Sequence, residues 1–128
     1  MQDTRKLFSV EKVAELFAAT DRFDVAVTSE FFHDDIEIVL GNNEPVRGKA
    51  GHARLSAQVK NLLKGIRHEI HDVWQAAGDD QTIIAAMTVH YTRLDDNVVS
   101  VPCSNIFRLE DGLIRHYQVY VDMAPVFA

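Results

Sequence analysis

The sequence predicts an α+β fold in which helices pack on one face of a curved antiparallel sheet. Two observations support this prediction. Apolar residues recur at helical spacing in most segments before Gly65, whereas apolar and polar residues alternate in the segments after it. The 128 residues are 47% hydrophobic and 25% charged, which is typical of one soluble globular domain spanning 1–128.

Two short helices are expected first. Ser9 is a suitable N-cap for the first helix, whose apolar residues recur at helical spacing until about Thr20. Asp21 is expected to cap the second helix. The apolar stripe of that helix consists of Phe23, Val27 and Phe31.

A strand and a longer helix follow. Residues 36–40 alternate in a way that predicts a strand, and residues 41–45 form a loop by composition. Helical spacing returns over 49–64. The apolar face of this helix consists of Leu55, Val59 and Leu62. Gly65 is expected at the C′ position that ends the helix.

Four strands are expected after Gly65, joined by turns rich in Asp, Asn and Gly. They span about 66–75, 82–93, 98–109 and 113–122. Pro102 lies inside the third of them and cannot donate a ladder hydrogen bond, so we expect a bulge or a sheet edge there. Several strands are apolar on both faces, which predicts that a second subunit covers the outer face in a homodimer.

Charge and cysteine content exclude several classes of protein. Thirteen Lys and Arg against nineteen Asp and Glu give a net charge of −6, and nucleic-acid binding requires a basic surface instead. The single cysteine, Cys103, excludes an internal disulfide framework and a thiolate-rich zinc site. No apolar run approaches the ~20 residues of a membrane span, and residues 1–6 lead into no signal-like stretch, so we expect a cytoplasmic protein without membrane contact.

Five polar residues interrupt otherwise apolar strand faces. They are His68, Thr88, His90, Asn105 and Tyr117. Burying an unpaired polar group costs about 1–3 kcal/mol, so such residues need partners or a wet cavity. If their faces coincide, these residues converge in a mostly apolar pocket with a few polar groups, which is the usual composition of a small-ligand site.

Four segments resemble the nuclear-transport-factor-2-like superfamily and are most similar to its polyketide-cyclase (SnoaL-like) branch. The segments are Phe32–Glu37, Pro45–Gly48, His68–Trp74 and Phe107–Ile114. The resemblance covers nearly the whole chain. It implies a cone-shaped sheet wrapped around about three helices, a pocket between them, and frequent dimerisation through the sheet. Members include isomerases, dehydratases, epoxide hydrolases, cyclases and non-catalytic binding domains, so the fold does not give the function.

Two enzyme branches of this superfamily do not match. The catalytic carboxylates and tyrosine of ketosteroid isomerases correspond here to Leu40, Asn105 and Leu16. The Asp-Arg-Asp set of limonene-epoxide-hydrolase-like enzymes is imitated only by Arg93-Leu94-Asp95, at a predicted hairpin tip. The last-strand aspartate of that set corresponds to Val119.

Scytalone-dehydratase-like enzymes match in part. Their two pocket histidines correspond to His68 and His90, and their pocket asparagine corresponds to Asn105. Three other positions differ. A tyrosine and an aspartate of the first helix, and a tyrosine of the first strand, correspond to Ala18, Ala19 and Ile38.

The leading hypothesis is a cofactor-free enzyme that dehydrates, isomerises or cyclises a small, largely apolar oxygenated molecule. His68 and His90 are the expected acid/base groups, and Asn105 is the expected orienting group. The expected substrate-binding residues are Leu40, Trp74, Thr88, Tyr117, Val119 and Val121. No metal ion is expected. If either histidine points away from the cavity, a non-catalytic ligand-binding or dimeric interaction domain becomes the better hypothesis.

The remaining residues of interest have structural expectations. His33, His52 and His116 are expected at the surface. Cys103 is expected to be a buried, unreactive thiol. Asp72 shares the predicted face of His68 and either orients that histidine or lies at the rim of the sheet. The apolar closing segment 123–128 is expected to fold over the pocket mouth or onto a partner subunit.

Overall fold

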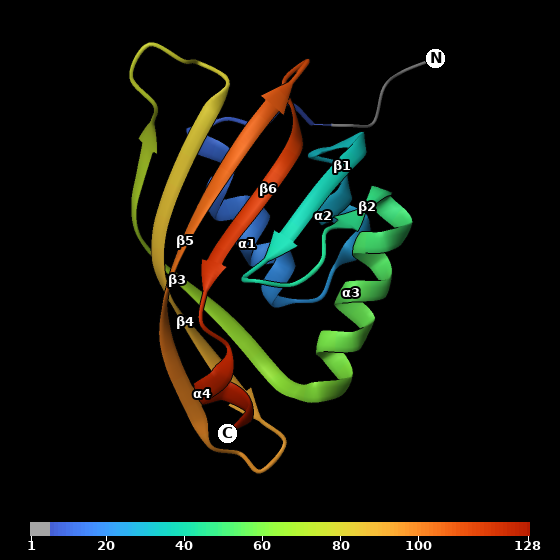
Figure 1. Ribbon diagram of the computed structural model, residues 1–128, viewed down its shortest axis with the longest axis vertical. Coiled ribbons are helices and arrows are strands. Elements are labelled where there is room, and N and C mark those ends of the chain that lie inside the picture. Colours follow the sequence, from blue (N-terminus) through green and yellow to red (C-terminus); the bar gives the residue numbers. More distant parts are fainter. Residues whose placement is uncertain (1–5) are drawn as a thin grey trace.

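The computed structural model describes residues 6–128, so residues 1–5, which carry most of the expectation about a leader segment, lie outside the described residues. The helical elements are η1 (Val10–Lys12), α1 (Val13–Asp21), α2 (Val25–Ser29), α3 (Gly48–Leu62) and α4 (Ala124–Phe127). The strands are β1 (Phe32–Leu40), β2 (Val46–Arg47), β3 (Leu63–Gln75), β4 (Thr82–Arg93), β5 (Val98–Glu110) and β6 (Leu113–Val121). Figure 1 shows the long strands curving along one side of the molecule and α3 standing on the other side.

The strands form one six-stranded sheet in the order β2-β1-β6-β5-β4-β3. The pairs from β3 to β6 are antiparallel, whereas β1 and β6 run parallel. The outermost strands β2 and β3 do not pair with each other, so the curved sheet stays open. The prediction of an α+β fold with N-terminal helices on one face of a curved sheet is confirmed, with one parallel pair that the sequence analysis did not include.

Helix ends differ from the prediction in two places. Asp24, not Asp21, caps α2, because its side chain accepts a hydrogen bond from the Val27 N–H at 3.1 Å. Gly65 does not end α3. The chain is already extended at Leu63, whose side chain is buried, and it continues directly into β3. Burial of an apolar side chain therefore ends this helix without a glycine.

Pro102 lies at a local edge of the sheet. The pairing of β4 with β5 runs through Thr88 and Pro102 without a shift in register, so there is no bulge at this position. On the other side of β5, the pairing with β6 begins only at Cys103, opposite Val121. Pro102 thus lies beyond the end of β6, where a missing N–H costs no ladder hydrogen bond.

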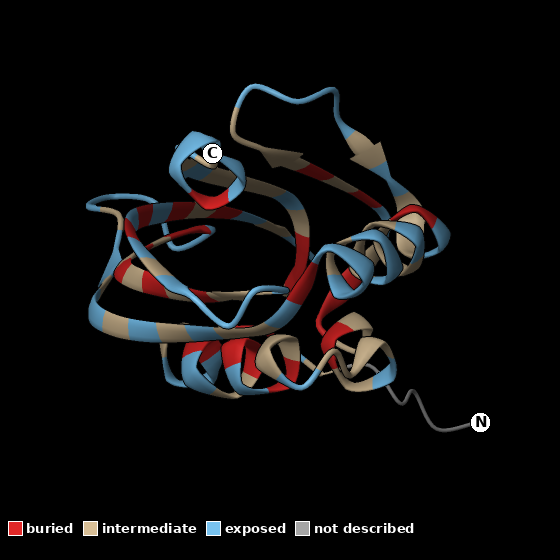
Figure 2. Ribbon diagram, turned by 90° about the horizontal axis from the view of Figure 1, so that it is seen from below, coloured by how far each residue is buried: buried red, intermediate tan, exposed pale blue. Residues whose placement is uncertain are grey.

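The core lies on the inner side of the curved sheet. Figure 2 shows buried residues alternating with more exposed ones along the strands, and a buried stripe on the helices packed against the sheet. The inner face of β4 is fully buried and consists of Ile83, Ala85, Met87, Val89 and Tyr91. Leu16 and Phe17 of α1 pack against the same core, and burying such side chains contributes about 1.5–3 kcal/mol each.

The closing segment packs back on one end of the molecule. Val126 in α4 is buried, and Arg93 Nη1 donates hydrogen bonds to the Val126 and Ala128 carbonyl oxygens at 3.2 and 2.9 Å. Arg93 therefore supports the C-terminus at the end of β4, which agrees with its expected place at a hairpin tip. Within residues 6–128, no helix combines the length and apolar character that a membrane span requires.

Candidate functional site

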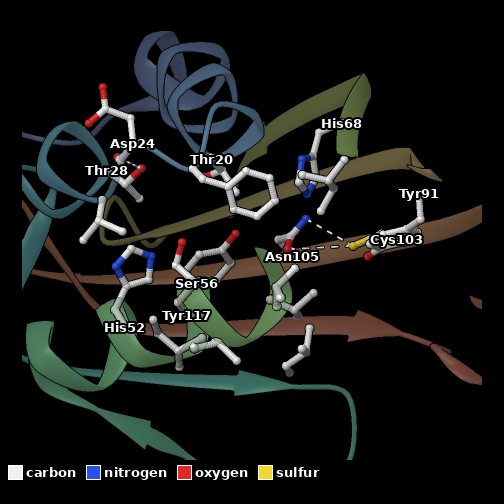
Figure 3. A pocket seen from close by; sticks show the side chains of 18 of the residues that line it. Thr20, Asp24, Thr28, His52, Ser56, His68, Tyr91, Cys103, Asn105 and Tyr117 are labelled. Carbon is white, nitrogen blue, oxygen red and sulfur yellow. Dashed lines mark hydrogen bonds between the residues drawn. The ribbon is translucent and has the colours of Figure 1, made fainter. Parts of the chain in front are cut away.

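A cavity of about 130 Å³ lies between the inner face of the sheet and the helices α2 and α3. The wall surface is mostly apolar, although about half of the lining residues carry a polar side-chain group, and Figure 3 labels them. A cavity of about 150 Å³ lined by apolar side chains can bind benzene, so this space suits a molecule of about one ring. Among the described residues, the lining contains no Lys or Arg. Its one carboxylate, Asp24, already accepts the hydrogen bond that caps α2.

His68 on β3 is held by a carboxylate from α1. Its Nδ1–H donates to Asp21 Oδ1 at 2.5 Å, and its backbone N–H also contacts both Asp21 oxygens at 3.2 and 3.1 Å. Because an ionised carboxylate only accepts hydrogen bonds, the proton of the neutral imidazole lies on Nδ1. Nε2 is therefore the basic nitrogen of a side chain that lines the cavity and is only 9% exposed.

Local helix geometry explains how His68 is positioned. Phe17 and Asp21 are four residues apart on α1, so their side chains lie on one face of the helix. The Phe17 ring stacks on the His68 ring at 4.7 Å between centroids. The imidazole is thus fixed by an apolar contact on its face and a hydrogen bond at its edge.

Asn105 on β5 is a buried amide with weak partners. It is 1% exposed, and its Nδ2 contacts only the sulfur atoms of Met87 and Cys103, at 3.5 and 3.7 Å. Sulfur is a poor hydrogen-bond acceptor. Figure 3 shows this amide next to His68 in the cavity wall.

Burial keeps the two phenols and the thiol of the wall uncharged. Desolvation raises the pKa of the Tyr117 and Tyr91 phenols well above 10, so both keep their protons. Desolvation also raises the pKa of Cys103 to about 11, and the expectation of a buried, unreactive thiol agrees with this environment.

His52 lies in the cavity wall, and the prediction that it is a surface residue is wrong. It comes from α3, and its ring packs edge-on against Phe32 at 4.8 Å between centroids. Its Nδ1 is completely buried and has no hydrogen-bond partner among residues 6–128. Desolvation lowers its pKa to about 4, so the ring is neutral at pH 7.

His90 lies on the opposite face of the sheet. Its Nδ1 and Nε2 contact Ser100 Oγ at 2.7 Å and Glu69 Oε1 at 2.8 Å, and it does not line the cavity. His68 pairs with Val89 across the β3–β4 ladder, so the next residue of β4 must point the other way. The expected convergence of His68 and His90 therefore does not occur.

Three of the six expected substrate-binding residues line the cavity. They are Leu40, Tyr117 and Val119. Thr88 points outward, where its hydroxyl contacts His71 Nε2 at 2.8 Å. Val121 faces inward opposite Cys103 but lies beyond the cavity. Trp74 is 48% exposed, because a bulge between Ile70 and the residues after it reverses the faces of β3.

The same bulge decides the position of Asp72. Asp72 pairs with the outward-facing Ala86, so it lies on the outer face and does not reach His68. The carboxylate that orients His68 is Asp21, which sequence reasoning had assigned to a helix cap. The signal for it was its spacing of four residues from the core residue Phe17.

Three potential metal ligands of the described residues come together away from the cavity. His33, Glu110 and Asp111 have one donor atom each within 4.8 Å of the others, and His33 Nε2 lies 2.9 Å from Glu110 Oε2. None of the three lines the cavity. The polar groups that the cavity wall itself offers are imidazole, amide, phenol, hydroxyl, thiol and carboxylate groups.

Comparisons with known proteins agree with this architecture. The model of the SnoaL-like domain family matches residues 13–117. A comparison with curated proteins found no match. Among solved structures, an NTF2-like protein of unknown function from Burkholderia pseudomallei K96243 has a TM-score of 0.83 at 14% identity, over 94% of this chain and 96% of its own.

Two other solved structures are similar. A putative polyketide cyclase from Pseudomonas putida KT2440 has a TM-score of 0.76 at 22% identity, over 92% of this chain and 94% of its own. TerC, co-crystallised with polyporic acid, has a TM-score of 0.80 at 18% identity, over 92% and 94% of the two chains. At these identities the likeness shows a common fold.

Proposed function

This chain belongs to the SnoaL-like domain family, as its sequence motifs predicted, and we propose that it is an enzyme that moves a proton on a small uncharged carbonyl compound. His68 is the general base. The observation that carries the proposal is the hydrogen bond from His68 Nδ1 to Asp21, which leaves the second imidazole nitrogen free in a mostly apolar cavity.

The proposed step is proton removal next to a carbonyl group. His68 Nε2 takes a proton from the carbon beside the carbonyl. The electron pair of that C–H bond forms a C=C bond to the carbonyl carbon, and the π pair of the C=O bond moves onto the oxygen. Asn105 Nδ2 and the Tyr117 hydroxyl donate hydrogen bonds to the negative charge that develops on this oxygen. Protonated His68 then returns the proton to another carbon or to a departing hydroxyl group, which gives isomerisation or dehydration.

The walls of the cavity restrict the substrate. The cavity has room for about one ring, and it offers no cationic side chain to a carboxylate or phosphate. A small, largely apolar ketone or enone fits these conditions. The chain's own residues supply the proposed acid and base, so the proposal needs no cofactor. Similarity to a putative polyketide cyclase and to a protein co-crystallised with polyporic acid supports an oxygenated ligand.

A second candidate function is non-catalytic binding of the same kind of molecule. The observation in its favour is that His90 lies outside the cavity, so the expected pair of acid/base histidines is not present. A binder needs Asn105 and Tyr117 for the carbonyl oxygen but no free base.

We also propose that two copies pair through the outer face of the sheet. Partly buried apolar residues lie at its centre, namely Val39, Ile84, Ala86 and Ile106. Acidic and basic groups lie around them, such as Glu37, Glu69 and Arg108, and a surface with both signs of charge can face its own copy. Analytical ultracentrifugation should give a dimer for the wild type and a monomer for Ile106→Glu.

The test of catalysis does not require the natural substrate. Cyclohexanone and acetophenone exchange the hydrogens beside the carbonyl with deuterated solvent, and NMR measures the rate. We expect the wild type to accelerate this exchange for at least one of them. His68→Gln should reduce the rate by about 10²–10⁴-fold, which is the usual contribution of a general base. The matched control, His90→Gln, should exchange as fast as the wild type.

Two outcomes would contradict the proposal. If the wild type binds a ketone without accelerating exchange, the protein is a binder. If His68→Gln and the wild type exchange at the same accelerated rate, another group is the base.

A further inference from the structure

We propose that His52 is a neutral hydrogen-bond donor that binds a second oxygen atom of the ligand, at the α3 wall of the cavity. The inference builds on the proposed function, because it extends the same site. It assigns a ligand class: an uncharged molecule with two oxygen functions, one near His68 and one near α3.

The position of His52 is the first argument. His52 and Ser56 are four residues apart on α3, so both side chains lie on the helix face that lines the cavity. Figure 3 shows them on the opposite side of the cavity from His68 and Asn105. The apolar stripe that begins at Leu55 includes His52 one turn earlier, so a polar ring replaces an apolar residue on a core-facing stripe.

The state of the ring is the second argument. Nδ1 of His52 has no contact with solvent and no hydrogen-bond partner in the described part of the chain, so the ring nitrogen left to face the cavity is Nε2. A neutral imidazole carries one N–H. Among backbone groups, buried N–H groups without an acceptor are rarer than buried C=O groups that lack a donor, and the proposal extends this preference to the imidazole. The proton therefore lies on Nε2 and points to the cavity, while the Nδ1 lone pair stays unpaired against the core.

His52 and His68 thus have opposite tautomers. Asp21 holds the proton of His68 on Nδ1, which makes its Nε2 an acceptor and a base. Because Nδ1 of His52 is buried, the N–H of that ring lies on Nε2, which is therefore a donor. Desolvation lowers the pKa of His52 to about 4, so this donor stays uncharged at pH 7.

The opposite tautomers of His52 and His68 determine which chemical groups the ligand must carry. A neutral N–H donor needs an oxygen acceptor, such as a carbonyl, hydroxyl or ether oxygen, and the Ser56 hydroxyl can contact the same atom. The wall has no Lys or Arg to balance a carboxylate or phosphate. A ring compound with oxygen functions at opposite ends can bind both the wall that contains His68 and the wall that contains His52.

Cyclohexane-1,4-dione and cyclohexanone test the inference, because they differ by one carbonyl group at nearly equal size. Isothermal titration should show that the wild type binds the dione about tenfold more tightly, as one hydrogen bond predicts. His52→Phe keeps a ring against Phe32 and should abolish this preference. His52→Gln restores an N–H donor and should recover part of it, while the exposed outer-face control His116→Phe should keep it in full.

A second measurement does not depend on ligand binding or on folding of the variants. The ¹⁵N chemical shifts of the wild-type imidazoles should show the Nε2–H tautomer for His52 and the Nδ1–H tautomer for His68 at pH 7. An Nδ1–H or charged His52, or a dione preference that is missing in the wild type or survives in His52→Phe, overturns the inference.

The two proposals fail separately. Loss of the dione preference in His52→Phe, together with no deuterium exchange in the wild type, rejects the catalytic function and keeps the His52 subsite. Exchange that depends on His68 but binding that ignores His52 keeps the function and rejects the subsite.

Discussion

His68 and His90 lie on neighbouring strands, and each contacts a carboxylate oxygen. Asp21 accepts the Nδ1–H of His68 at 2.5 Å, and Glu69 Oε1 lies 2.8 Å from Nε2 of His90. The difference lies in the second nitrogen. In His90 it contacts Ser100 Oγ, whereas in His68 it belongs to a ring that lines a cavity.

This comparison shows that a carboxylate partner does not by itself make a catalytic histidine. The inner carboxylate comes from α1, across the core, and leaves the other side of the ring to the cavity. The outer partners, Glu69 and Ser100, come from the strands on either side of His90 and occupy both ring nitrogens. A base needs one nitrogen that the protein itself does not use.

The largest expected effect comes from removing the inner-face carboxylate, Asp21. Asp21→Asn allows the amide to donate to Nδ1, which moves the His68 proton to Nε2 and removes the base. Deuterium exchange of the ketone probes should then fall by up to about 10⁴-fold, the loss that the corresponding Asp→Asn change causes in a Ser-His-Asp triad. The matched outer-face variant Glu69→Gln should leave exchange unchanged. Equal exchange rates in the two variants would show that the inner carboxylate has no role in orienting His68.

The sequence predicted the strands well because their alternation and turn residues are local. The predicted strand 82–93 coincides with β4, and the strand at 98–109 differs from β5 by one residue. Helix ends were less predictable. Local rules placed a glycine cap at Gly65, but tertiary burial of Leu63 starts β3 two residues earlier.

The site was less predictable because it depends on register and on distant contacts. Alternation divides each strand into two faces but does not show which faces of neighbouring strands coincide. The sequence-based hypothesis therefore placed His68 and His90 on the same face of the sheet. The bulge in β3 reversed Trp74 in the same way. Asp21 and His68 are 47 residues apart, and no local pattern joins them. The inward position of His52, in contrast, could have been predicted from the sequence, because His52 lies three residues before Leu55 on the predicted apolar stripe.

His52 extends the comparison of His68 and His90, because it is a cavity histidine without a carboxylate partner in the described part of the chain. Burial lowers the pKa of His52 to about 4, against about 6.5 in an unfolded chain. The unfolded state therefore binds a proton that the folded state rejects between these values. Proton binding to His52 in the unfolded state therefore leaves the free energy of unfolding unchanged above pH 6.5. As the pH falls from 6.5 toward 4, it lowers that free energy by about 3 kcal/mol in total.

Urea denaturation of the wild type and His52→Gln at several pH values measures this effect. The difference in unfolding free energy between them should be constant above pH 6.5. Between pH 6.5 and 4 it should shift in favour of the variant, because Gln does not titrate, while contributions from other groups cancel. A difference that stays flat down to pH 4 would mean that His52 is solvated in the folded protein.

The smallest expected effect concerns the inner-face amide and separates stability from binding. Asn105 is buried against sulfur atoms, so its amide loses hydration without gaining a strong hydrogen bond. Asn105→Leu should raise the free energy of unfolding by about 1 kcal/mol and weaken cyclohexanone binding about tenfold. The exposed neighbour Ser104, changed to Ala, should alter neither quantity. If Asn105→Leu instead destabilises the protein by more than about 2 kcal/mol, the amide stabilises the fold. The polar group of the inner face would then resemble His90, with its partners supplied by the protein and none left for a ligand.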